Sequence, residues 1–339
     1  MMKSILTVFL SMIICTLLSA DLFAGGRPHN LVKPTGPPVP QVISPEHDTR
    51  AWSVRKLPDT GQQVKSTDVF GSDTAYSINT PSFTDNGNNT ITDNITGIMW
   101  QKISKGDNSF DQAVKYCKTL NLAGYENWRL PDIDELYNLI NLDRPPINSK
   151  YFLNEKEANT HYSSTTLAGD DSRVWGINRG GGIGAYPKSE PSSVSAERRR
   201  TFNTRCVRDT FEAKKVKEHF SDNKDNTVRD NSNGLVWQQA EAGEMAWEDA
   251  LRYCENLSLG GKDDWRLPNV KESRSMCDYT LYSPSVDLQY FPGLKTTWHW
   301  TSSTTQRGRV VWYINYVSSS ATYSERTEKL EVRCVRGGF

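Results

Sequence analysis

The sequence predicts an α+β protein made of two tandem copies of one domain, each with two helices and a short-stranded antiparallel sheet stapled by a disulfide. Three observations predict this: a repeat at constant spacing, helical spacing of apolar residues in each copy, and matching cysteines. Trp100-Gln101 recurs as Trp237-Gln238, and Trp128-Arg129-Leu130-Pro131 recurs as Trp265-Arg266-Leu267-Pro268. The spacing is 137 positions in both cases and holds without a gap from Phe83 to Glu135.

The N-terminus has the pattern of a secretory signal peptide. Lys3 supplies a positive charge, and the apolar run from Ile5 to Leu18 is shorter than the about 20 residues that a membrane span needs. We therefore expect residues 1–24 to be a signal peptide, with an uncleaved anchor as the alternative. The protein is then secreted, periplasmic or displayed on the cell surface, with no membrane contact after cleavage.

The domain boundaries follow from composition and from the repeat. Residues 25–55 are rich in Pro and Gly, which favours an extended linker over a packed domain. Residues 56–210 form the first domain with an N-terminal strand extension, and residues 211–339 form the second. Lys plus Arg equals Asp plus Glu at 40 each, and this balance argues against a nucleic-acid-binding protein.

Each copy opens with short strands joined by turns rich in Asp and Asn, at 83–100 and 220–237. Such oxygen-rich turns are also candidates for binding calcium, although neither copy has the spacing of a twelve-residue calcium loop. We expect no metal and retain calcium as the alternative. The candidate residues are Asp85, Asn86, Asp93, Asn94, Asp222, Asp225, Asp230 and Asn231.

Two helices follow the opening strands. Ala113, Cys117 and Leu120 have helical spacing, and their counterparts in the second copy repeat it. A second helix after Trp-Arg-Leu-Pro is predicted by capping boxes at Asp132 and Asn269, each with Glu three residues on. Short strands complete each copy, and Ser163–Thr166 matches Ser302–Thr305 letter by letter.

Four of the cysteines match between the copies. The repeat pairs the position of Cys117 with that of Cys254, and Cys206 with Cys334. The simplest disulfides are therefore Cys117–Cys206 and Cys254–Cys334, with pairing between the copies as the alternative. Cys277 is left over and maps onto a helix position that should be buried, so we interpret it as a core residue; a reactive thiol is the alternative.

The motifs Thr-Asp-Asn-x-x-Gly, Ala-x-x-Tyr-Cys, Trp-Arg-Leu-Pro and Arg-Cys-Val-Arg together resemble the Lcl C-terminal domain family, twice over residues 60–339. The resemblance implies a C-type-lectin-like domain, related in shape to sulfatase-modifying factors. It also implies attachment to sulfated polysaccharides, as in the collagen-like adhesin for which the family is named. This chain lacks a collagen-like tract.

Residues found in only one copy are the candidates for ligand binding, because residues common to both copies mostly maintain the fold. An aromatic cluster of the second copy is a candidate sugar site, with an enlarged core as the alternative. A basic set in a Gly-rich loop of the first copy is a candidate for sulfate or acidic glycans, with a solvated charge run as the alternative. The residues are Trp247, Trp298, His299 and Trp300 in the first set and Lys188, Arg198, Arg199 and Arg200 in the second.

No catalytic motif stands out in the sequence: the five histidines are scattered, and no nucleophile elbow or phosphate loop is present. We therefore expect no catalytic residues and a non-enzymatic secreted or surface module for binding or adhesion, with an extracellular or surface polysaccharide as its partner. The alternatives are an enzyme or modifying factor and a structural envelope protein.

Overall fold

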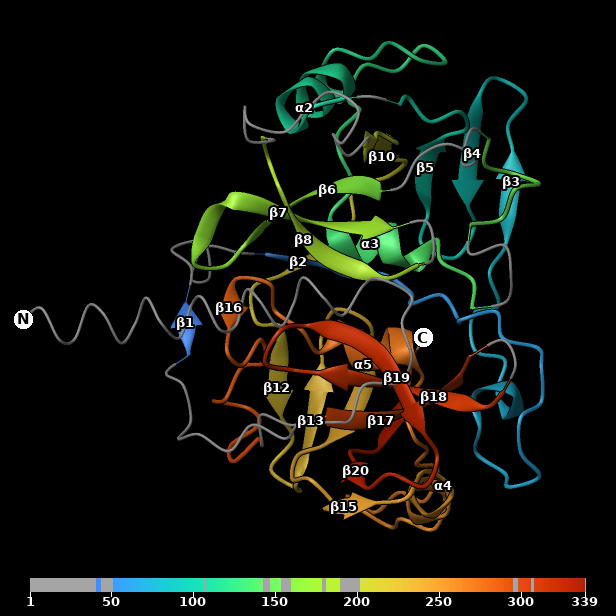
Figure 1. Cartoon of the computed structure of the whole chain (residues 1–339), viewed down its shortest axis with the longest axis vertical. Helices are drawn as coiled ribbons and strands as arrows, with labels where there is room; N and C mark the ends of the chain where they lie inside the picture. Colours follow the sequence, from blue (N-terminus) through green and yellow to red (C-terminus); the bar gives the residue numbers. More distant parts are fainter. Residues whose placement is uncertain are drawn as a thin grey trace, which may run out of the picture. The chain divides into compact units, whose positions relative to one another are not determined.

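The computed structural model describes residues 41–43, 51–106, 108–142, 147–153, 160–178, 181–189, 202–294, 298–305 and 308–338. In these residues the protein is mostly β, with four α-helices and two disulfides (Figure 1). No helix in this part of the chain is long and apolar enough to cross a lipid bilayer.

The opening strands that the turn-rich sequence predicts are present in each copy, and the last strand of the copy joins them in a four-stranded antiparallel sheet. In the first copy the strand order is β10-β5-β4-β3, with β3 Phe83–Asp85, β4 Thr90–Asp93, β5 Ile98–Gln101 and β10 Val207–Asp209. In the second copy the order is β12-β13-β14-β21, with β12 Phe220–Asp222, β13 Thr227–Asp230, β14 Leu235–Gln238 and β21 Val335–Gly337.

The helices occupy equivalent places in the two copies. They are α2 Phe110–Lys118 and α3 Ile133–Asn138 in the first copy, and α4 Trp247–Glu255 and α5 Val270–Ser275 in the second. The expected capping boxes are present at Asp132 with Glu135 and at Asn269 with Glu272. A six-residue helix makes few internal hydrogen bonds, so α3 and α5 depend on these caps and on packing.

A second sheet follows the helices in each copy. The first has the order β8-β7-β6-β9, with β6 Thr160–Leu167, β7 Asp170–Asn178, β8 Ile183–Pro187 and β9 Phe202–Asn203. The other has the order β15-β20-β17-β18-β19, with β15 Glu244–Met245, β20 Leu330–Glu331, β17 Trp298–Thr304, β18 Val310–Asn315 and β19 Ser320–Glu325.

Both disulfides join the first helix of a copy to the segment before its last strand. Cys117–Cys206 and Cys254–Cys334 close loops of 89 and 80 positions, with a Cα–Cα distance of 5.5 Å in each. The pairing within each copy is therefore confirmed. Disulfides of this kind persist in oxidising compartments, which indicates an extracellular or periplasmic environment.

Part of the stretch expected to be a linker forms strands. β1 Val42–Ile43 pairs with β16 Leu281–Tyr282, and β2 Trp52–Ser53 pairs with β11 Lys215–Val216. Both partners lie far away in the sequence, and local composition carries no signal for such pairing.

One apolar cluster spans both copies, within a unit of residues 34–339, and a second cluster lies within the first copy. Leu136 and Ile140 of the first copy belong to the same buried cluster as Met276 and Cys277 of the second. Cys277 is free and fully buried, so its interpretation as a core residue is confirmed. Burial also raises the pKa of its thiol to about 11, which suppresses the reactive thiolate.

Candidate functional site

The aromatic cluster of the second copy lies mostly in the interior. The Trp247 and Trp300 side chains are 0% and 1% exposed, and their indole N–H groups donate to the carbonyl oxygens of Thr301 (2.9 Å) and Met245 (3.0 Å). His299 is 2% exposed, with Nε2 2.7 Å from a Glu241 carboxylate oxygen. These buried side chains have no free face on which a sugar could stack. They are therefore part of an enlarged core, which was the alternative to a sugar site.

These aromatic residues also have counterparts in the first copy, which the sequence comparison missed. The backbone N–H of Ser302 donates to Pro268 O (2.7 Å), as that of Ser164 donates to Pro131 O (2.8 Å). Ser164 is therefore equivalent to Ser302, and the letter-by-letter match of the Ser-Ser-Thr-Thr runs is one residue out of register. In the corrected register Trp300 corresponds to Tyr162.

In the corrected register both copies have aromatic side chains at the same core positions. Trp247 corresponds to Phe110, which packs edge-on against Tyr162 with ring centroids 5.6 Å apart. Trp298 differs from its neighbours because it is only partly buried, and its ring lies 5.8 Å from that of Tyr313. Trp298 is thus the one member of the cluster whose side chain is partly exposed to solvent.

Only one member of the basic set, Lys188, lies in the described part of the chain, and it lies in the first copy, whereas the aromatic cluster lies in the second. Arg198, Arg199 and Arg200 lie outside the described residues. Lys188 is partly exposed, and its ammonium lies 5.3 Å from the ring centroid of Phe110 in the first copy.

The turns considered as calcium sites are Asx turns. Asp93 Oδ1 accepts from the backbone N–H of Ile95 (2.9 Å) and Thr96 (3.2 Å), and Asp85 Oδ1 accepts from that of Gly87 (3.0 Å). No group of three or more His, Cys, Asp or Glu side chains suited to a metal occurs in the part of the chain that the structure describes.

The arginines shared by the two copies each form a two-pronged ion pair, a fork, with a glutamate. Arg129 donates to both carboxylate oxygens of Glu135 (2.7 Å each), and Arg266 does the same to Glu272 (2.6 Å each). Each fork ties the Trp-Arg-Leu-Pro segment to the first turn of the following helix, and this makes both arginines structural residues.

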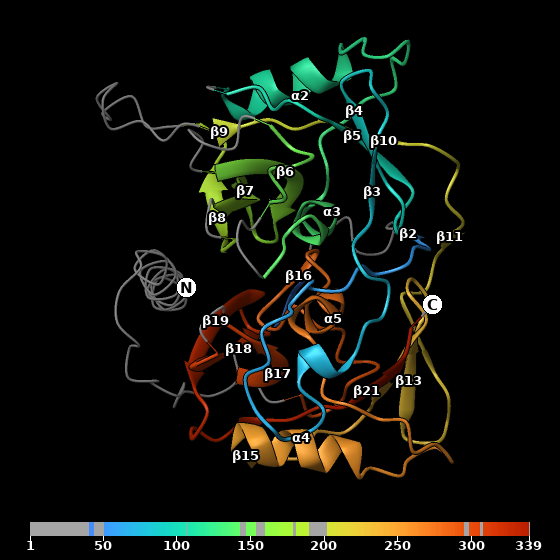
Figure 2. The same ribbon diagram turned by 90° about the vertical axis from the view of Figure 1, so that its right-hand side faces the viewer.

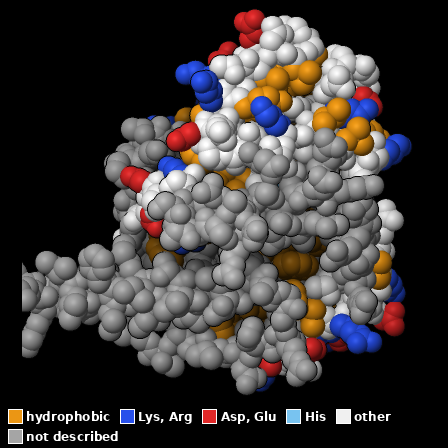
Figure 3. All heavy atoms as spheres, turned by 45° about the horizontal axis from the view of Figure 1, so that its top comes forward, with side chains coloured by type: hydrophobic (Ala, Val, Ile, Leu, Met, Phe, Trp, Pro, Cys, Tyr) orange, Lys and Arg blue, Asp and Glu red, His pale blue; other side chains and the backbone are white. Residues whose placement is uncertain are grey.

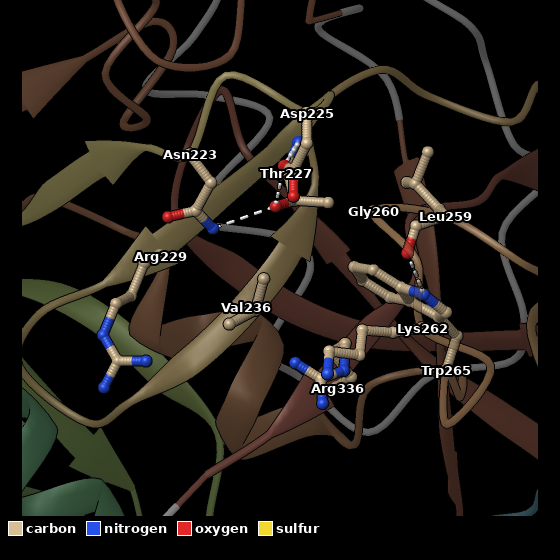
Figure 4. A pocket seen from close by; sticks show the side chains of 10 residues that line it. All are labelled: Asn223, Asp225, Thr227, Arg229, Val236, Leu259, Gly260, Lys262, Trp265 and Arg336. Atoms are coloured by element: carbon tan, nitrogen blue, oxygen red, sulfur yellow. Dashed lines mark hydrogen bonds between the residues drawn. The ribbon is translucent and has the colours of Figure 1, made fainter.

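A hollow on the second copy brings together charged residues that the sequence comparison did not single out. Its volume is about 220 Å³, and Figure 4 shows the side chains that line it. Across β13, β14 and β21, Arg229 and Arg336 both face Val236 in the pairing register. The lining consists of Asn223, Asp225, Thr227, Arg229, Val236, Leu259, Gly260, Lys262, Trp265 and Arg336.

Positive charge exceeds negative charge at this hollow, where three cations, Arg229, Lys262 and Arg336, stand against the carboxylates of Asp225 and the neighbouring Asp264. Arg336 is paired with Asp264 (2.6 and 3.0 Å), and Asp225 Oδ1 accepts from the hydroxyl of Thr227. The exposed guanidinium of Arg229 and ammonium of Lys262 make no ion pair or side-chain hydrogen bond with the described residues. Two cations beside the apolar Val236 are suited to an anionic group on a larger ligand.

The first copy fills the equivalent place. At the 137-residue spacing, Tyr125 stands where the second copy has Lys262, and the Arg208 guanidinium lies 3.8 Å from the Tyr125 ring centroid. Thr92 stands where the second copy has Arg229. Both replacements can be seen in the sequence, but only the structure shows that Arg229 and Lys262 line one hollow.

The rest of the visible surface is mixed in charge. Figure 3 shows acidic and basic side chains interspersed over the described part of one face, without a large area of a single sign. This agrees with the formal net charge of zero.

Comparison with known families agrees with the duplication. The model of the Lcl C-terminal domain family matches residues 89–208 and again 226–336, which takes in the helices and most strands of both sheets in each copy. No curated protein matches the chain. The two matches cover well over half of the sequence, and the chain therefore belongs to the Lcl C-terminal domain family, in two tandem copies.

Proposed function

We propose that the protein is a secreted or surface-displayed, non-enzymatic binding module of C-type-lectin-like shape, whose second copy holds an acidic polysaccharide. The observation that carries this proposal is the excess of positive charge at one hollow, where Arg229, Lys262 and Arg336 outnumber the carboxylates of Asp225 and Asp264. Guanidinium and ammonium groups bind carboxylate and sulfate esters through charge-assisted hydrogen bonds. The amide of Asn223 and the carboxylate of Asp225 supply partners for sugar hydroxyls at the same site.

The size of the hollow favours a polymer as ligand. At about 220 Å³ it is smaller than the roughly 300–1,000 Å³ of sites that enclose a whole small molecule. It therefore accommodates one charged sugar unit, and the rest of the ligand lies across the surface. A polymer with repeated charged units gives such a site many chances to bind.

The buried thiol supports a binding role over an enzymatic one. Cys277 is the free cysteine among the described residues, and its pKa is raised to about 11 by burial. A nucleophilic cysteine needs an accessible thiolate near neutral pH; this site gives no access, and burial outweighs the stabilisation that Arg274 gives the thiolate.

The test is binding of the full-length protein to immobilised dextran sulfate, polygalacturonate and neutral dextran, with and without calcium. We expect saturable binding to at least one acidic polymer, and a loss of about tenfold in affinity for Arg229→Gln and for Lys262→Gln. The matched control is Lys329→Gln, which removes one exposed charge from the same copy outside the hollow. No binding to either acidic polymer, or equal losses for Lys262→Gln and Lys329→Gln, refutes the proposal.

A further inference from the structure

A segment that precedes the first copy packs on the second copy. Residues 59–76, here named the strap, include the short 3-10 helix η2 Asp73–Ala75. Gln62 of the strap donates to the carbonyl oxygen (2.7 Å) and hydroxyl (2.8 Å) of Thr304, and accepts from the backbone N–H of Thr304 (3.0 Å). In Figure 2 the blue-to-cyan strap runs beside α5 and β17.

The strap covers the arginine fork of the second copy. The Asp73 carboxylate accepts from the Ser303 hydroxyl, while the Tyr76 ring lies 5.3 Å from the Arg266 guanidinium carbon. The Tyr76 hydroxyl donates to Glu255 (2.6 Å). As a result Arg266 is 4% exposed and Ser303 is fully buried.

The first copy has a matching surface that no strap covers among the residues that the structure describes. The backbone N–H of Ile133 donates to the Thr165 hydroxyl (3.0 Å), as that of Val270 donates to the Ser303 hydroxyl (3.0 Å). With this register Thr165 is the counterpart of Ser303. Unlike Ser303, Thr165 is only partly buried, and its neighbour Ser164 is exposed.

The exposed fractions of the two forks show the difference most directly. The Arg129 side chain is 40% exposed, whereas that of Arg266 is 5% exposed. The arginine fork and the hydroxyl that receives Asp73 thus have preformed, more exposed counterparts in the first copy. A surface held in this way binds without reorganisation of its backbone. Two other groups that bond the strap are replaced there: Lys118 stands where Glu255 accepts from Tyr76, and Asp134 stands where Lys271 donates to Asp59.

The helix caps of the two surfaces also differ in charge. The second copy has Asn269 at the start of α5, and the first copy has Asp132 at the start of α3. Burial and the neighbouring Glu135 and Asp134 raise the pKa of the Asp132 carboxyl. A cation placed beside Asp132 stabilises its ionised carboxylate, whereas another carboxylate in the position of Asp73 repels it.

We propose that the surface of the first copy formed by Arg129, Asp132, Ser164 and Thr165 docks an extended segment of a partner protein, as the second copy docks the strap, and that the segment carries Lys or Arg where the strap carries Asp73. The main chain of the docked segment takes the same course as the strap, and the Lys or Arg side chain of the segment pairs with the Asp132 carboxylate. This inference is independent of the polysaccharide site, which lies on the second copy.

The test uses two synthetic peptides of residues 57–79, one native and one with Asp73→Lys, each labelled with a fluorophore and titrated into the full-length protein. We expect the Asp73→Lys peptide to bind saturably and at least about tenfold more tightly than the native peptide, as judged by fluorescence anisotropy. The protein variant Asp132→Asn should abolish this preference. Its cap is preserved, because Asn269 caps α5 in the same way.

Two further variants locate the site and control for charge. Ser164→Trp places a bulky side chain on the exposed surface and should abolish binding of both peptides, without touching the strap on the second copy. Asp263→Asn removes an exposed carboxylate from the second copy and should leave the peptide preference unchanged. The proposal is overturned by absence of saturable binding, by binding that survives Ser164→Trp, or by a preference that persists in Asp132→Asn.

Discussion

The buried carboxyl of Asp73 predicts that the protein loses stability as the pH rises from 4 to 7. Asp73 is 4% exposed, and burial together with the nearby Asp59 raises its pKa from 3.8 to about 7. Between these values the folded protein keeps a proton that the unfolded chain releases, so the free energy of unfolding falls by about 1.4 kcal/mol per pH unit from this group. The loss is complete above pH 7 and amounts to about 4 kcal/mol.

The variant Asp73→Asn isolates this effect. The asparagine oxygen keeps an acceptor for the hydroxyls of Thr60 and Ser303, which both donate to one oxygen of Asp73. Since asparagine does not titrate, the variant should be close to wild type in stability at pH 4 and more stable by up to about 4 kcal/mol at pH 8. Urea titrations followed by tryptophan fluorescence at pH 4, 6 and 8 measure the difference.

The control for this prediction is Asp68→Asn, which removes a carboxylate from the same strap. Asp68 is fully exposed and paired with Lys65 at 2.8 Å, so its substitution should not reproduce the gain at pH 8. If Asp73→Asn destabilises the protein equally at all three pH values, the hydrogen bonds of the carboxyl outweigh its burial and the reasoning is wrong.

Three further predictions concern the core. Replacing both cysteines of the second disulfide by alanine opens a loop of 80 positions and should lower the free energy of unfolding by about 4 kcal/mol in urea titrations; no loss would contradict a stabilising bridge. Arg266→Met leaves Glu272 buried without its partner and should cost about 3–5 kcal/mol. Arg129→Met should cost less, because that side chain is 40% exposed, and equal losses in the same assay would refute the role of burial. Cys277 should react with a thiol reagent at pH 8 only as fast as the native protein unfolds, and labelling within seconds would show an accessible thiol.

Local patterns were sufficient to predict the elements that depend on local interactions. The capping boxes at Asp132 and Asn269 involve residues three positions apart, and the disulfides follow from matching cysteines in a repeat. Packing of the strap on the second copy was not predictable, because Gln62 and Thr304 are 242 positions apart and neither belongs to a periodic pattern. The sequence interpretation placed this segment with the first domain.

The candidate ligand residues illustrate a different limit. Identical letters placed Ser163 opposite Ser302, and that match left Trp300 without an aromatic counterpart. Backbone hydrogen bonds set the true register one residue away, so that Trp300 and Tyr162 occupy one core position. In a strand one residue changes the face on which a side chain lies, so a register error of this size exchanges core and surface. The same comparison at the 137-residue spacing correctly aligned Tyr125 with Lys262, where no gap intervenes.

The two copies have diverged in opposite ways at two surfaces. In the second copy the strap buries the arginine fork, while the hollow beside Lys262 is open. In the first copy Tyr125 and Arg208 fill the equivalent of that hollow, while the fork at Arg129 faces solvent. Duplication therefore does not supply two identical sites, and a simple gain in avidity from repeated binding is not expected. On the two proposals above, the chain instead joins unlike partners, with an acidic polysaccharide on the second copy and a basic extended segment of a protein on the first. Occupancy of one site should then leave the affinity of the other unchanged, as measured by titrating the peptide with and without a saturating acidic polymer.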